Sequence, residues 1–155
     1  MERTLVLVKP DGVQRGLVGE ILGRFERKGL KVVGLRLLQV PRAMAEEHYA
    51  VHGGKHFYAG LVEFITSGPV AAAVLEGPDA IAVVRRLVGA TMPGQAEPGT
   101  VRGDLGISGL RNLVHASDGP ETAATEVALW FGAEGPLDYS RDIDAWIVAE
   151  EPPRP

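Results

Sequence analysis

A histidine at position 115 lies between small and polar neighbours, in the segment Asn112-Leu113-Val114-His115-Ala116-Ser117-Asp118. Neutral imidazole is a nucleophile near pH 7, so a positioned histidine can carry a transferred group covalently. A single histidine is a weak signal, because most histidines are ordinary surface or core residues. The residues that follow this one along the chain make it a candidate nucleophile.

The residues after this histidine predict a helix that runs to about Phe131 and stops at Gly132. Asp118 and Glu121 match a capping box, and Pro120 fits an early helical position, where no amide hydrogen is needed. Its apolar residues recur at helical spacing and form one stripe: Ala123, Val127 and Trp130.

Glu126 lies on the same stripe of this predicted helix. A buried carboxylate without a partner is costly, and the helix begins close enough to His115 to bring Glu126 back over the imidazole. A carboxylate on one ring nitrogen would fix the tautomer and leave the other nitrogen free to attack. The alternative is that Glu126 lies at the edge of the stripe and reaches water, as glutamates usually do.

No phosphate-binding loop of the form G-x-x-x-x-G-K-[ST] and no G-x-G-x-x-G is present, so phosphate would have to be held by side chains. Lys9 ends the first apolar run, where a strand meets its turn. Arg85 shares a helix face with Ile81 and Val88, and Arg102 follows a glycine-rich loop. Guanidinium groups clamp phosphate oxygens bidentately. The alternative for each cation is an ordinary solvated or salt-bridged surface side chain.

The 155 residues suit a single domain, and 45% hydrophobic with 23% charged residues is ordinary for a globular soluble protein. Without cysteine there is neither a disulfide framework nor a thiolate nucleophile or zinc cluster. No apolar stretch is long enough for a membrane span and the beginning of the chain lacks a signal-peptide pattern, so we expect a cytoplasmic protein without a membrane partner. The net charge of −4 disfavours nucleic acid as a partner but allows a small phosphate ligand.

Elements of two kinds alternate along the chain. Strands are predicted at 5–8, 31–40 and 70–75, and a short one precedes the last helix; further helices begin near residues 18, 43, 57 and 79. This order predicts an α+β sandwich of the split βαβ kind, an antiparallel sheet with helices on one face. Residues 89–111 read as a long loop, and loops of that length inside a compact domain are usually functional or disordered.

Several separated segments, from Thr4 to about Phe131, resemble the nucleoside diphosphate kinases. The matching motifs are Val8-Lys9-Pro10-Asp11-Gly12-Val13-Gln14-Arg15-Gly16, Gly60-Leu61-Val62-Glu63, Ser67-Gly68-Pro69-Val70, Gly89-Ala90-Thr91, Pro98-Gly99-Thr100-Val101-Arg102-Gly103-Asp104 and the segment 112–118. Their number and order make the resemblance specific.

The resemblance implies a ferredoxin-like βαββαβ fold with a long nucleotide-site loop. It implies transfer of the γ-phosphate of ATP, or another nucleoside triphosphate, to a nucleoside diphosphate by a ping-pong route through a phosphohistidine on His115. Mg²⁺ would be carried on the nucleotide phosphates. Residues 1–132 would be the kinase domain. The family forms tetramers or hexamers, and the tail, 133–155, would pack on the domain or on a neighbouring subunit.

The resemblance also assigns roles to individual residues. Ser117 and Glu126 would support the His115 ring, and Tyr49 would be the aromatic residue near the phosphates. The nucleotide contacts would be Lys9, Phe57, Arg85, Thr91, Arg102 and Asn112. Phe57 would stack on the base, a contact that every base tolerates, although its apolar stripe also fits an ordinary core position.

Two positions depart from the family pattern. Gly109-Leu110 reverses the usual order of an apolar residue and glycine. In the family that apolar residue packs on the base opposite the phenylalanine, so the resemblance does not assign the second wall of the base site. Met92 replaces the more usual asparagine before Pro93, in a loop near subunit contacts. The alternative function is a catalytically silent binding or regulatory subunit on the same scaffold, which should lack His115 or the cations around it.

Overall fold

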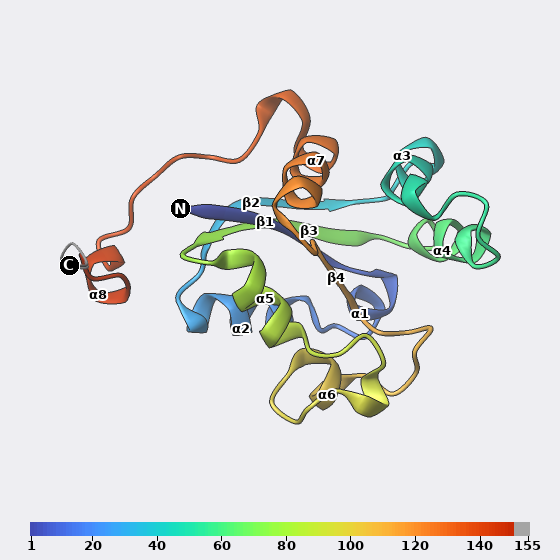
Figure 1. Cartoon of the computed structure of the whole chain (residues 1–155), viewed down its shortest axis with the longest axis horizontal. Helices are drawn as coiled ribbons and strands as arrows, with labels where there is room; N and C mark the ends of the chain where they lie inside the picture. The colour runs from blue at the N-terminus through green and yellow to red at the C-terminus, as the bar shows by residue number, and fades with distance from the viewer. Residues whose placement is uncertain (151–155) are drawn as a thin grey trace.

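The computed structural model describes residues 1–150; residues 151–155, the end of the predicted tail, lie outside the described part of the chain. A four-stranded antiparallel sheet forms the centre of the domain, in the order β2-β3-β1-β4 (Figure 1). Its strands are β1 (Glu2–Val8), β2 (Lys31–Leu38), β3 (Val70–Gly77) and β4 (Val114–Ala116). This arrangement confirms the predicted ferredoxin-like α+β fold.

The inner strand β1 is buried on both faces of the sheet. Val6 and Val8 belong to the apolar core on one face, and Leu5 and Leu7 belong to the core on the other. Side chains alternate across a strand, so an unbroken apolar run requires cover on both sides. The continuous run 5–8 therefore dictates a three-layer domain.

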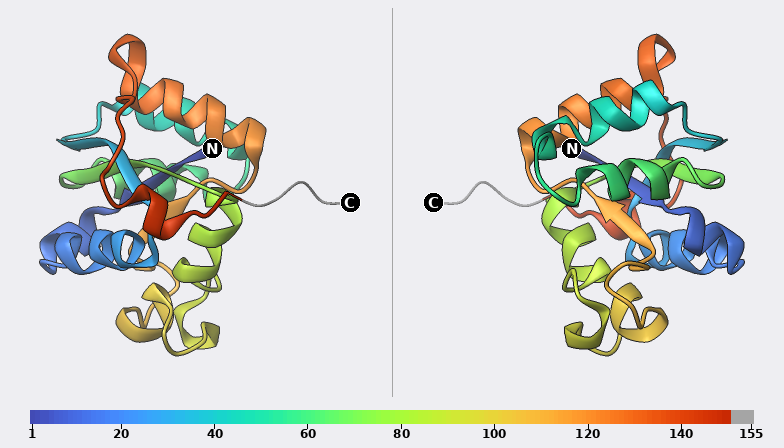
Figure 2. Two further views of the ribbon diagram at one scale, coloured as in Figure 1. Left: turned by 90° about the vertical axis from the view of Figure 1, so that its left-hand side faces the viewer. Right: turned by 90° about the vertical axis from the view of Figure 1, so that its right-hand side faces the viewer.

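The helices lie on both faces of the sheet, which corrects the expectation of helices on one face (Figure 2). The crossover helices α2 (Val18–Lys28) and α5 (Ala80–Val88) cover one face. On the other face lie α3 (Arg42–His48), α4 (Tyr58–Ile65) and α7 (Pro120–Phe131). Since β1 and β3 are apolar on both sides, the second face needs this additional layer.

The long segment 89–111 is partly helical. It contains a 3₁₀ turn, Pro93–Gln95, and the short helix α6 (Val101–Leu105), in whose first turn the Gly103 amide donates to the Thr100 hydroxyl at 3.0 Å. The remaining short elements are α1 (Pro10–Gln14), the 3₁₀ turns Ala50–His52 and Gly132–Glu134, and α8 (Asp144–Ile147).

The predicted capping box of α7 is wrong. Gly119 occupies the N-cap position, and no side chain caps the helix, although Pro120 does take the first helical position. Asp118 instead lines the cavity described below. Similarly, Asp79 stands at the N-cap of α5 with a left-handed backbone (φ 49°) and makes no side-chain cap bond.

The tail runs back along β2, the edge strand of the sheet. The Leu137 amide donates to the Val33 carbonyl at 2.8 Å, and Arg141 donates to the Gly29 carbonyl at 3.1 Å. Trp146 of α8 remains 89% exposed. No helix within residues 1–150 has the length and apolar character needed to cross a membrane.

Candidate active site

A cavity of about 320 Å³ lies where β4, the ends of α3 and α5, and the loop 89–111 meet. Most of the residues predicted for the site line it: Lys9, Tyr49, Arg85, Thr91, Arg102, Asn112, His115 and Glu126. Ser117 lies behind Glu126, and Phe57 lies outside the lining. The fold therefore gathers side chains from α5, α6, α7 and the segments between elements around one histidine.

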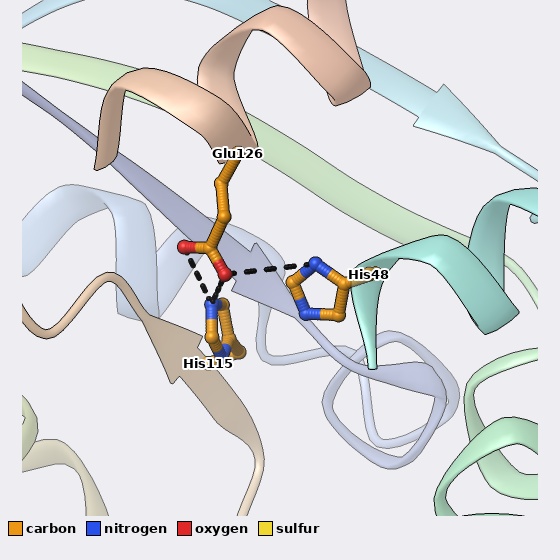
Figure 3. A group of neighbouring side chains, drawn as sticks. All are labelled: His48, His115 and Glu126. Carbon is orange, nitrogen blue, oxygen red and sulfur yellow. Dashed lines mark hydrogen bonds and ion pairs between the residues drawn. The ribbon is translucent and has the colours of Figure 1, made fainter. Parts of the chain in front are cut away.

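His115 is held by a carboxylate from α7. It lies on β4 opposite Leu7 of β1, with its side chain 24% exposed. Its Nε2 lies 2.9 Å from Oε2 and 3.0 Å from Oε1 of Glu126, whose side chain is buried (Figure 3). Of the two placements that the sequence left open for Glu126, the structure shows the buried one.

The Glu126 carboxylate determines which nitrogen of His115 is free. Burial would raise the pKa of Glu126, but the hydrogen bond and charge of His115, with the Ser117 hydroxyl, hold this pKa below its ordinary value. An ionised carboxylate only accepts hydrogen bonds, so Nε2 must carry the ring proton. The lone pair of a neutral His115 is therefore on Nδ1, where it can act as a nucleophile.

Ser117 fixes the orientation of this carboxylate. Its hydroxyl donates to Glu126 Oε1 at 2.6 Å and accepts from the Leu5 amide at 3.3 Å. The Ser117 amide in turn donates to the Leu5 carbonyl at 3.2 Å. The fully buried Ser117 thus connects β1 to the carboxylate that holds the histidine.

His48 lies beside His115 and Glu126, and the sequence analysis did not place it in the site. It ends α3 as a nearly fully buried side chain, and its ring lies edge-on to that of His115, with centroids 4.7 Å apart. The Trp130 indole donates to His48 Nδ1 at 3.1 Å. Burial, and then the neighbouring His115, lower the pKa of His48 to about 4.

Because its lowered pKa leaves His48 neutral, His48 does not form an ion pair with Glu126. Its Nδ1 accepts the Trp130 proton and lies 3.6 Å from Glu126 Oε2. Two acceptors face each other there, so the contact is not an ion pair. His48 follows Met44 and Ala45 at helical spacing, so it shares the side of α3 that contacts the core. That spacing was the available sequence signal, but a single polar residue in a seven-residue helix gave it little weight.

Lys9 and Asn112 are hydrogen-bonded to each other just after the C-terminal end of β1. The Lys9 ammonium donates to Asn112 Oδ1, and Asn112 Nδ2 donates to the Thr91 carbonyl at 3.2 Å. Lys9 is only 9% exposed, and burial, with the nearby Arg102 charge, lowers its pKa to about 8. Lys9 is therefore not the freely solvated strand-end lysine that the sequence left as an alternative.

Arg102 and Arg85 bring two further cations to the two ends of β4. Arg102 donates to the carbonyls of Val114 (2.6 Å), Asn112 (3.1 Å) and Gly89 (3.2 Å). Arg85 donates to the Ala116 carbonyl at 3.2 Å. A guanidinium has five N–H groups, so Arg102 keeps donors for a ligand while its backbone bonds fix its position.

Phe57 is 40% exposed just before α4, so it is not the core residue that its apolar stripe allowed. Its ring lies 5.2 Å from that of His52, which lines the cavity.

The two departures from the family pattern lie against each other: a Cβ on Gly109 would lie 2.7 Å from the Met92 methyl carbon. Leu110 is 80% exposed.

Known proteins match this chain over most of its length. A family model described as nucleoside diphosphate kinase matches residues 2–135. A nucleoside diphosphate kinase of Carboxydothermus hydrogenoformans is 57% identical over 147 residues, which cover 95% of this chain and 99% of that protein. One from Archaeoglobus fulgidus is 56% identical over 150 residues, which cover 97% of this chain and 99% of that protein.

Solved structures agree with the sequence matches. A nucleoside diphosphate kinase family protein of Babesia bovis superposes with a TM-score of 0.93 at 47% identity, covering 96% of this chain and all of that one. The enzyme of Halobacterium salinarum, solved in complex with CDP, superposes with a TM-score of 0.92 at 51% identity, covering 95% and 98% of the two chains. With its fold, its sequence and its family model in agreement, this chain belongs to the nucleoside diphosphate kinase family of phosphotransferases.

Proposed function

We propose that this kinase works through a phosphohistidine formed at Nδ1 of His115. The observation that carries the proposal is the Glu126 carboxylate on Nε2, which leaves the Nδ1 lone pair free. In the first half-reaction, Nδ1 forms a bond to the γ-phosphorus of ATP or another nucleoside triphosphate while the bond to the β-phosphate oxygen breaks. The nucleoside diphosphate leaves, and a second one takes the phosphoryl group from Nδ1 by the reverse step.

The cations around His115 would position and neutralise the transferring phosphate. Phosphoryl transfer needs little covalent help beyond the nucleophile, so fixed positive charges supply most of the catalysis. Arg85, Arg102 and Thr91 would hold phosphate oxygens, with the Tyr49 hydroxyl nearby. Lys9 and Asn112, already joined, would contact the sugar, and the exposed ring of Phe57 would stack on the base.

We propose that Mg²⁺ enters on the nucleotide phosphates. It prefers oxygen ligands and keeps several waters. Within residues 1–150, the ligand group that the fold assembles consists of two histidines and one carboxylate, and that carboxylate is bonded to His115 and Ser117. This donor set does not suit Mg²⁺, which would neutralise phosphate charge from the nucleotide side.

We further propose that the chain forms a homo-tetramer or homo-hexamer in the cytoplasm, where its nucleotide substrates are. Residues 1–132 would act as the kinase domain, and the tail, 133–155, would contribute to assembly. Apolar side chains exposed on the edge strand β2 and on α8 support this: Leu35, Leu37 and Trp146. Exposed apolar side chains of this kind favour association with another chain.

Initial rates of GDP phosphorylation by ATP test the mechanism. A phosphoenzyme route predicts parallel double-reciprocal lines as the second substrate is varied. His115→Ala should abolish turnover while ATP still binds, because the cations and Asn112 remain. Intersecting lines, or turnover retained in His115→Ala, would contradict the proposal.

A further inference from the structure

His48 completes a group with His115 and Glu126, and phosphoryl transfer gives it no role there. Each offers one nitrogen or oxygen atom, and these atoms lie within 4.8 Å of one another. The three side chains come from α3, β4 and α7 and point toward a common centre (Figure 3). His48 is not needed to hold the ring, because Glu126 and Ser117 already do so.

Two histidines and a glutamate are the ligand set of a zinc site with an open fourth position. Hard Mg²⁺ avoids imidazole nitrogen, whereas Zn²⁺, Ni²⁺ and Cu²⁺ bind it. The chain has no cysteine and four histidines, so a tight site for such metals has to use histidine. Among residues 1–150, this is the one place where at least three such ligands meet.

The two separations that involve Glu126 are close to what a metal needs, and the histidine nitrogens lie within 4.8 Å of each other. Tetrahedral ligands about 2.1 Å from zinc lie about 3.4 Å from each other. Here His115 Nε2 lies 2.9 Å and His48 Nδ1 lies 3.6 Å from Glu126 Oε2. The fourth position would face the 320 Å³ cavity, which gives a cation a way in.

We propose that His48, His115 and Glu126 bind a divalent transition metal of the zinc class, and that the bound cation inhibits phosphoryl transfer. Metal binding follows from the geometry alone. The inhibition rests on the proposed function, because it acts on the nucleophilic nitrogen of His115.

The inhibition follows from the proton on the His115 ring. In the metal-free site, Nε2 carries the proton and Nδ1 carries the lone pair. A metal on Nε2 displaces the proton that pointed at Glu126, and the neutral ring keeps it on Nδ1 instead. Nδ1 then has no lone pair for the γ-phosphorus, so the same cluster that activates the nucleophile can switch it off.

Metal binding also has a second consequence, which can be followed by the fluorescence of Trp130. A neutral imidazole has a single lone pair, and that of His48 now accepts the Trp130 indole proton. Whichever nitrogen of His48 binds the metal, Trp130 loses its acceptor. The metal must therefore change the surroundings of Trp130, and Trp130→Phe, which removes the competing hydrogen bond, should bind it more tightly than the parent chain.

The surrounding charges set the strength of this site. Lys9, Arg85 and Arg102 line the same cavity and oppose a divalent cation, while Glu126 contributes one negative charge within the cluster. We therefore expect a weaker and more readily reversed site than a structural zinc site. A chelator that binds zinc but not Mg²⁺ should remove the metal without stripping Mg²⁺ from the nucleotide.

Binding is tested with ZnCl₂ alone, by calorimetry on the assembled, nucleotide-free protein. We expect one zinc per chain, binding weakened about tenfold or more in Glu126→Gln and in His48→Gln, and no change in the matched control His56→Gln, an exposed histidine outside the cluster. In a Trp146→Phe background, Trp130 fluorescence should change with the same midpoint. No binding in the parent chain, equal binding in all variants, or unchanged fluorescence would overturn the site.

Inhibition is tested separately, by labelling with γ-labelled Mg-ATP at a buffered free zinc concentration. We expect zinc to suppress acid-labile label on the parent chain and to leave the labelling of His48→Gln much less affected relative to its own zinc-free value. Zinc that binds without suppressing the label would overturn the inhibition. Absence of label even without zinc would instead contradict the phosphohistidine, so the two failures are distinguishable.

Discussion

The charge of Lys9 depends on pH in the working range, because burial and Arg102 lower its pKa to about 8. Above that pH the free enzyme loses the Lys9 charge that would face the nucleotide. We predict that kcat/KM for ATP falls about tenfold per pH unit above pH 8. Lys9→Arg keeps its charge, so its kcat/KM should be lower at pH 8 but should fall less as the pH rises. The same decline in Lys9→Arg would show that another group titrates.

His48 couples the stability of the protein to acid. Its pKa is about 4 in the folded state against 6.5 for an unperturbed histidine, so the unfolded chain binds more protons between these values. Stability must therefore fall as the pH drops from 6.5 to 4, by about 3 kcal/mol from this residue. In His48→Gln, urea unfolding should lose that much less over the same range. Parallel pH profiles for the two proteins would mean that His48 is not buried in neutral form.

The short helix α6 is an element whose position depends on one glycine. A Cβ on Gly103 would overlap the backbone carbonyl of Glu97, and Arg102 is the adjacent residue. We predict that Gly103→Ala destabilises the protein by about 1–3 kcal/mol and raises KM for ATP, because α6 must shift and take Arg102 with it. The control in the same loop is Gly94→Ala, where a Cβ meets no neighbour. Similar effects of the two substitutions would contradict this role of α6.

Elements with strong local patterns could be predicted from the sequence. The apolar run 5–8 indicated an inner strand, which β1 is, and the helix expected after His115 is α7, which ends at Phe131 as predicted. The pairing of Glu126 with His115 could be proposed because one helix face carried both the carboxylate and the core residues. These inferences needed only neighbours along the chain.

What the sequence did not reveal depends on contacts between distant elements. His48 meets His115 because α3 packs on the face of the sheet opposite Val114 and Ala116, the face to which the His115 side chain of β4 points. The expected single layer of helices had no place for that packing. The capping box failed because a motif match cannot tell whether Asp118 turns back to α7 or toward the cavity.

At the scale of the whole molecule, the tail covers part of the exposed β2 edge. Ending the chain at Phe131 removes the Leu137–Val33 hydrogen bond and the exposed Trp146. We predict that the full chain has the mass of a tetramer or hexamer by light scattering, and that the truncated chain shifts to smaller species. An identical mass for both proteins would refute the role of the tail in assembly.

The central claim is that Glu126 makes Nδ1 of His115 the nucleophile, and the direct measurement is the position of the phosphate on the ring. The protein would be incubated with γ-labelled ATP, digested in alkali, and its two phosphohistidine isomers separated by chromatography. The structure predicts label on the Nδ1 isomer, absent from His115→Ala and discharged by GDP. Label on the Nε2 isomer or on another residue, or no label at all, would contradict it.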